Sequence, residues 1–220
     1  MRSVFVFFAV LFPIIAIVHS ISWAAHYGGW ERIKTFRLLF DMNSEATLAA
    51  FYNSLLLLAV SVLMWMHGKM EGVREIRRGW LLLAAVFFFL SWDEAAEIHE
   101  KLNKFTTAAL GGGDLGIFKF SWVIPYLGLL IVLAIVLIPF MRRLNRKLLL
   151  RLILAGLVYV GGAMGVEMIS ATMVYESAGY KAVTTLEECL EISGLLLCFY
   201  FLMQALPSAE RAIHLDTQQR

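Results

Sequence analysis

Residues 81–100 read LLLAAVFFFLSWDEAAEIHE, so an apolar run passes directly into a polar one in which five of the eight positions from 93 to 100 are ionisable. The stretch from Trp80 to Trp92 has only 13 residues, which gives about 20 Å of helix against roughly 30 Å of hydrocarbon in a bilayer. The preceding VREIRRG is too charged to suggest an earlier start. The sequence therefore predicts one helix over 80–102 that carries its acidic residues into the membrane.

The composition is typical of a protein that crosses a membrane several times. Of its 220 residues, 60% are hydrophobic and 16% are charged, and the mean hydropathy is +0.74. Soluble domains are about 45–50% apolar and about 25% charged. The net charge of +2 is too small to indicate a nucleic-acid partner. Cys189 and Cys198 lie in one apolar segment, too far apart on a helix to pair, so no disulfide framework is expected.

Six apolar segments have the length expected of spanning helices. They lie at about 3–22, 46–66, 80–102, 119–141, 148–172 and 185–206. Because the connections are short, the expected fold is all-α, a six-transmembrane-helix bundle that forms a single domain over residues 1–220. The first segment, with Arg2 before it and HSISWAA at its end, also has features of a signal peptide. That alternative stays open.

Basic residues predict the orientation of this bundle. They concentrate in loops 67–79 and 142–151, whereas 104–118 and 171–184 carry one Lys each. The positive-inside rule then places the two basic loops and both termini in the cytoplasm of a cell with an inner (plasma) membrane. Loop 23–44 is the exception, because its three basic residues fall on the outer side.

With this orientation, four helices bring acidic residues to one level near the outer, periplasmic face. The residues concerned are Glu45, the acids of 93–100, Glu167 and the acids of 187–191. A charge at the centre of a bilayer costs at least about 2.5–3.5 kcal/mol, so their convergence favours a functional site.

Helical geometry adds detail to the third segment. At about 100° per residue, Asp93, Glu97 and Glu100 share one face of the predicted helix, and His99 points about 120° away from Asp93. His99 is therefore expected to serve a different neighbour or to contact lipid headgroups.

Local helix chemistry explains some of these residues without a site. Asn43 or Ser44 is a suitable N-cap for a first-turn Glu45. Both Thr184-x-x-Glu187 and Thr185-x-x-Glu188 are typical of capping boxes.

Glycine and aromatic residues yield two further structural predictions. Gly161-x-x-x-Gly165 indicates a close helix contact. Four aromatic residues are typical of interface anchors, namely Trp122, Tyr126, Trp65 and Trp80.

The acids also suggest a metal site. Glu97-x-x-Glu100 and Glu188-x-x-Glu191, with single carboxylates from two other helices, are similar in layout to the di-iron and di-manganese carboxylate bundles, although the histidine position holds Glu in both pairs. The predicted metal ligands are Asp93, Glu97, Glu100, Glu167, Glu188, Glu191, Glu45 and His99. The expected cofactor is a divalent metal, Fe, Mn, Zn, Mg or Ca, with oxygen ligands favouring the harder ions.

Three classes of function remain compatible with this reading. The first is a metal-dependent membrane hydrolase or oxidoreductase that acts on a lipid-like or small cationic substrate. The second is a proton- or cation-coupled transporter or channel that uses the same acids. The third is a structural or assembly subunit. Zinc-protease, histidine-box and Gly-x-Ser-x-Gly motifs do not occur in the sequence, so no catalytic residue is assigned.

Overall fold

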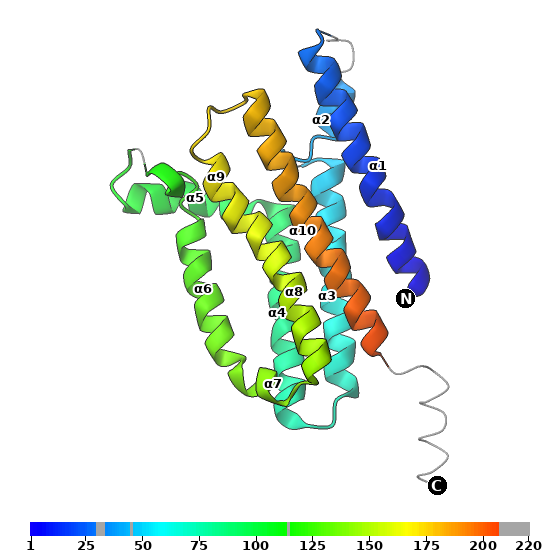
Figure 1. Ribbon diagram of the computed structural model, residues 1–220. Helices are drawn as coiled ribbons and strands as arrows, with labels where there is room; N and C mark the ends of the chain where they lie inside the picture. The colour runs from blue at the N-terminus through cyan, green and yellow to red at the C-terminus, as the bar shows by residue number, and fades with distance from the viewer. Residues whose placement is uncertain (30–33, 45, 114, 207–220) are drawn as a thin grey trace.

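The structure, a computed structural model, describes residues 1–29, 34–44, 46–113 and 115–206, and every regular element in these ranges is a helix. In chain order the elements are α1 (Arg2–Tyr27), α2 (Lys34–Leu39), α3 (Leu48–Met70), α4 (Arg74–Ala96), α5 (Ile98–Ala109), η2 (Gly116–Phe118), α6 (Val123–Val136), α7 (Ile138–Arg143), α8 (Arg146–Val160), η3 (Gly161–Val166), α9 (Glu167–Ser170) and α10 (Ala178–Ala205). Figure 1 shows the long helices side by side in one bundle.

Four stretches of the described chain are long and apolar enough to cross a membrane. They are Arg2–Tyr27, Leu48–Met70, Arg74–Ala96 and Arg146–Ser170. A fifth apolar helix, Val123–Val136, is shorter. These helices agree with the predicted all-α membrane bundle. The six crossings and the direction of insertion remain predictions.

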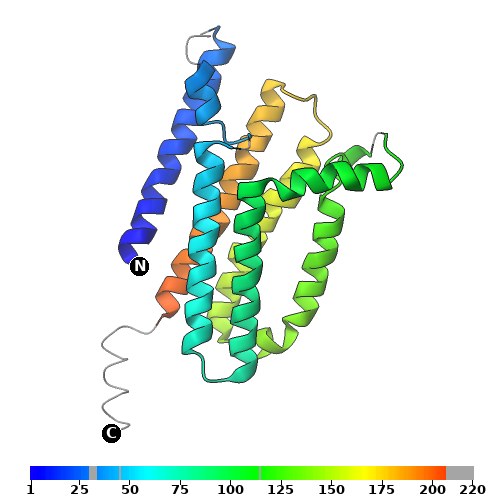
Figure 2. The same ribbon diagram turned by 180° about the vertical axis from the view of Figure 1, so that it is seen from behind.

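The helix that contains residues 81–96 differs from its prediction at both ends. It begins at Arg74, so VREIRRG does extend it, and its 23 residues supply about 34 Å. It ends at Ala96 because Glu97 adopts a left-handed conformation, with φ 53° and ψ 43°. The predicted continuation to residue 102 is therefore wrong. Figure 2 shows α5 running crosswise at the end of α4.

The predicted helix over 119–141 is also divided. Its two parts, α6 and α7, meet at Leu137, two residues before Pro139. Proline has no N–H with which to continue a helical hydrogen-bond ladder, and it is tolerated in the first turn of a new helix. The break therefore falls where the sequence can supply a new helix start.

The N-caps of two helices correct the capping predictions. The last helix begins at Ala178, and the Ser177 hydroxyl caps it by accepting from the Tyr180 N–H at 3.1 Å. Thr184 and Thr185 therefore lie inside α10, where their hydroxyls donate to backbone carbonyls of the same helix. The capping boxes predicted for Glu187 and Glu188 are wrong.

The start of α3 differs from its prediction as well. Thr47 caps this helix by accepting from the Ala50 N–H, in place of Asn43 or Ser44. Glu45, the acid predicted to lie in the first turn, falls outside the described residues.

Glycine does bring α8 and α10 together, but at other positions than predicted. A Cβ on Gly194 would lie 2.6 Å from the Tyr159 backbone nitrogen, and one on Gly162 would lie 2.9 Å from the Glu187 carbonyl oxygen. Gly161 and Gly165 have open space where a Cβ would be, so the predicted contact through them is wrong. The intervening turn, Gly161–Val166, is π-helical. Gly162, within this turn, faces α10.

The two ends of the bundle differ in chemistry. The connections from α3 to α4 and from α7 to α8 lie at one end in Figure 1, and the basic segments 67–79 and 142–151 consist of these connections and the helix ends that they join. The other end holds α5, α9 and the start of α10, together with the acidic residues of these helices.

Candidate functional site

Asp93, in the last turn of α4, is the centre of a buried hydrogen-bond network. Only 5% of the residue is exposed. Its Oδ1 accepts from the backbone N–H of His99 at 2.8 Å and lies 3.2 Å from His99 Nδ1. Its Oδ2 accepts from the Tyr126 hydroxyl at 2.7 Å. The left-handed turn at Glu97 makes this possible, because it returns the chain so that His99 meets Asp93. The prediction that His99 serves a different neighbour is wrong for this reason.

Glu167, the first residue of α9, is held by a residue from α6's N-terminus. The indole Nε1 of Trp122 donates to its Oε1 at 3.1 Å, and both residues are buried. The Trp122 ring also lies 5.3 Å from the His99 ring and 5.1 Å from the Tyr126 ring. Two of the aromatic residues predicted as interface anchors, Trp122 and Tyr126, thus bind the carboxylates of Glu167 and Asp93.

The acids of α10 face the same region. Coulombic interactions link Glu187 to Glu167, to Glu191 and to His99. Tyr159 of α8 interacts in the same way with Glu191, Glu94, Asp93 and Glu188. These interactions therefore join side chains of five helices, α4, α5, α8, α9 and α10, in one region.

One cavity of about 610 Å³, here called the cleft, joins these residues to a long apolar wall. Its acidic end is lined by Asp93, Glu94, Glu100, Glu167, Glu187, Glu188 and Glu191, together with His99. Its apolar wall includes Leu82 and Phe89 of α4, Leu129 and Val136 of α6, and Val160 and Met164 of the α8–η3 segment. The volume is within the range of about 300–1,000 Å³ that small-molecule sites occupy.

The predicted site residues divide between three places. Six of the eight line the cleft. Glu97 is the left-handed residue between α4 and α5 and does not line it. Glu45 lies outside the described residues. Sequence reasoning gave no role to Tyr159 and Tyr180, which also line the cleft, because a tyrosine in an apolar helix carries no local signal of what it faces.

A metal ion needs several ligating side chains that converge on one point. Within the described residues, no three His, Cys, Asp or Glu side chains lie close enough together to hold one ion. The side chains as placed thus do not form the predicted centre, in part because Glu97 is turned out of register with Glu100 by the break after Ala96. The metal remains a prediction, and no chemical step is derived through it.

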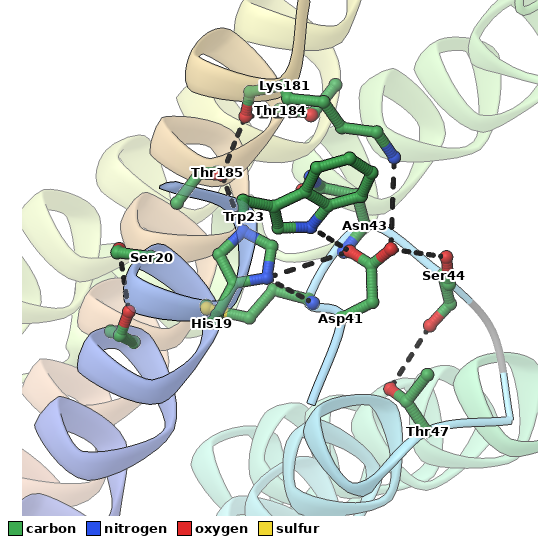
Figure 3. A network of polar contacts seen from close by, with 12 residues as sticks. His19, Ser20, Trp23, Asp41, Asn43, Ser44, Thr47, Lys181, Thr184 and Thr185 are labelled. Atoms are coloured by element: carbon green, nitrogen blue, oxygen red, sulfur yellow. Dashed lines mark hydrogen bonds and ion pairs between the residues drawn. The ribbon is translucent and has the colours of Figure 1, made fainter. Parts of the chain in front are cut away.

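A second buried polar network fixes the loop beside the cleft (Figure 3). Asp41 accepts from the Trp23 indole at 3.3 Å, from the Asn43 N–H at 3.1 Å and from the Ser44 hydroxyl at 3.1 Å. Lys181 of α10 forms a buried ion pair with the same carboxylate at 3.9 Å. Because Met42, Asn43 and Ser44 also line the cleft, this network holds part of its wall.

His19 connects α1 to the same network. The Met42 N–H donates to its Nδ1 at 3.0 Å, which places the ring proton on Nε2. Nε2 lies 2.8 Å from Thr185 Oγ1, and that hydroxyl donates to the Lys181 carbonyl. His19 is therefore a neutral structural bridge, so its 3.6 Å approach to Asp41 is not an ion pair.

Trp23 packs against two buried basic residues, Arg37 of α2 and Lys181 of α10. The Arg37 guanidinium lies 4.4 Å from the indole centroid, and Lys181 Nζ lies 4.5 Å from it. Arg37 is only 8% exposed. Its buried position therefore follows from packing against Trp23.

Comparison with known proteins gives one match. Residues 4–205 match a family model described as a domain of unknown function (DUF8692). Neither the curated proteins nor the solved structures contain a match.

Proposed function

We propose a function for this chain, which belongs to the DUF8692 family. It is a six-pass inner-membrane protein that binds a lipid-like substrate in the cleft. It acts on this substrate near the outer face of the membrane. One observation carries the proposal: a single cavity joins the apolar side chains of α4, α6 and α8 to seven carboxyl groups at the end opposite the basic loops. An apolar wall beside a polar end suits a molecule that has both parts.

The apolar wall has the dimensions of a lipid chain site. Along α6 the cleft runs from Trp122 to Val136, about 20 Å at 1.5 Å per residue. That is about two-thirds of the hydrocarbon core of a bilayer. Leu129, Val132 and Val136 are 61%, 57% and 56% exposed, so this side of the cleft is open. A substrate would enter through it from the surrounding lipid.

The acidic end offers acid–base chemistry. A hydrogen bond from His99 Nδ1 to the Asp93 carboxylate keeps the proton of a neutral imidazole on Nδ1 and leaves the lone pair on Nε2. His99 lines the cleft, so its ring would exchange a proton with a bound head group or a water molecule there. Asp93 acts in this scheme as a positioning residue, because it orients the imidazole.

A divalent metal at the same acids is the second candidate. It is favoured by a lining in which α4, α5, α9 and α10 all contribute carboxylates, which are the ligands that hard cations prefer. Elemental analysis of gently purified protein tests it. A stoichiometric metal that disappears in the double variant Glu167→Gln, Glu191→Gln would support this candidate, and protein that neither contains nor takes up metal would reject it.

Photo-crosslinking tests the cleft itself. An uncharged single-chain lipid alcohol with a diazirine in its chain is expected to label α6 of the protein in nanodiscs. Replacing Leu130, which lines the cleft, by Trp should reduce labelling because the larger side chain fills the chain site. Leu154→Trp is the matched control, because Leu154 is exposed on α8 and is not part of the lining. Uniform labelling of all lipid-facing helices would contradict the proposal, and acid-dependent ion flux in liposomes would favour a transporter.

A further inference from the structure

The electrostatic character of the cleft is one-sided. Its described lining contains seven carboxyl groups and one histidine, and it contains neither lysine nor arginine. Several carboxyl groups on the wall of one cavity repel a phosphate or sulfate head group, and they attract a cation. Two buried cations that do not line the cleft have other partners: Arg37 lies against the Trp23 ring, and Lys181 lies against the same ring and pairs with Asp41.

Aromatic rings stand beside these acids. Trp122, Tyr126, Tyr159 and Tyr180 all line the cleft, and Trp122 meets Tyr126 edge to face with ring centroids 5.1 Å apart. Ring faces attract ammonium groups, and combinations of aromatic rings with acids are used to recognise them. The same protein already places Lys181 and Arg37 against an indole ring at 4.5 and 4.4 Å.

The side-chain amide of Asn43 is a further polar group at the cleft. Both its Oδ1 and its Nδ2 are shielded from solvent and lack a partner among the described residues. The residue lines the cleft. Because shielded polar atoms are normally hydrogen-bonded, a ligand in the cleft would satisfy this amide, with Oδ1 accepting from an ammonium N–H.

We propose that the occupant of the cleft is a long-chain amine, that is, an amphiphile with one hydrocarbon chain and an ammonium head. Its head lies among the acids, the rings of Trp122 and Tyr126, and Asn43, and its chain lies between α4, α6 and α8. This assignment rests on the proposed function, since it specifies the head group of the molecule that the cleft binds.

The test compares three probes of equal chain length on the full chain in nanodiscs. They are a primary alkyl amine, the corresponding alcohol and the corresponding alkyl phosphate, each competing with the diazirine alcohol for labelling of α6. The amine is expected to compete at a concentration at least about tenfold lower than the alcohol, and the phosphate least well. Equal competition by amine and alcohol, or a preference for the phosphate, overturns the proposal.

Substitutions in the cleft distinguish recognition of the ammonium head from binding of the hydrocarbon chain. Glu187→Gln with Glu191→Gln should bring the amine down to the level of the alcohol while labelling by the diazirine alcohol persists, which also shows that the protein is folded. Glu75→Gln is the matched control, because Glu75 pairs with Arg143 near the opposite end of α4. An amine preference that survives the double variant overturns the proposal. Labelling without a charge preference defeats only the ammonium assignment, whereas failure of the diazirine alcohol to label α6 defeats the proposed function and this assignment with it.

Discussion

The Asp93 carboxylate accepts from the backbone N–H of His99 at 2.8 Å and lies 3.2 Å from the same residue's Nδ1. Two residues six positions apart could not meet in this way on a continuous helix, because they would be separated by about 9 Å along its axis. The left-handed Glu97 between them is therefore the local feature on which the geometry of the site depends.

Replacing Asp93 by Asn should lower the stability of the fold. The substitution removes the charge that the hydrogen bonds from His99 and Tyr126 stabilise, at a cost of about 1.5–3 kcal/mol for charge-assisted bonds. Thermal unfolding in detergent is the measurement, and Glu75→Gln, an exposed ion-pair partner, is the control. An unchanged melting temperature would show that the Asp93 network contributes nothing to stability.

Glu97 should act as the turn residue between α4 and α5 and not as a metal ligand. A non-glycine residue in the left-handed region costs about 1–2 kcal/mol, so Glu97→Gly should raise the melting temperature. Glu97→Val should lower it, because a β-branched residue tolerates this conformation poorly. Both variants should keep any metal that the wild type contains. Loss of a stoichiometric metal in Glu97→Gly would instead restore Glu97 as a ligand.

Gly194→Ala should separate α8 from α10. Its new Cβ would lie 2.6 Å from the Tyr159 nitrogen and 2.9 Å from the Ala155 carbonyl oxygen, and backbone atoms cannot move aside as a side chain can. Overpacking of this kind typically costs about 1–3 kcal/mol. Gly156→Ala on α8 is the matched control, since nothing lies within 4 Å of its Cβ position. Equal stability of the two variants would contradict the close contact.

Lys181→Met should destabilise the chain more than an exposed lysine substitution does. It leaves the Asp41 carboxylate, in a residue only 2% exposed, without its ion-pair partner. Breaking a buried pair on one side costs about 3–5 kcal/mol. Adding Asp41→Asn should recover part of that loss, which a double-mutant cycle of unfolding free energies would measure. Lys147→Met, at an exposed position, is the control. Strictly additive losses would mean that Lys181 and Asp41 do not interact.

The sequence by itself determined the fold class and the places where apolar helices run. Composition and run length are sufficient for that, because a helix of membrane length satisfies its own backbone and needs only apolar side chains. The same local information identified Asp93, Glu100, Glu167, Glu188, Glu191 and His99, which line one cleft. Their roles within that cleft are still predictions.

Only the tertiary structure decided which residues meet. Asp93 and Tyr126 are 33 positions apart, and Asp41 and Lys181 lie on segments joined by most of the chain. Hydropathy and helical period describe one element at a time, so neither could indicate these pairs, the left-handed break at Glu97 or the contact through Gly162 and Gly194. Those features follow from how α4, α6, α8 and α10 pack, and that packing also leaves the cleft with carboxylates at one end and hydrocarbon along its length.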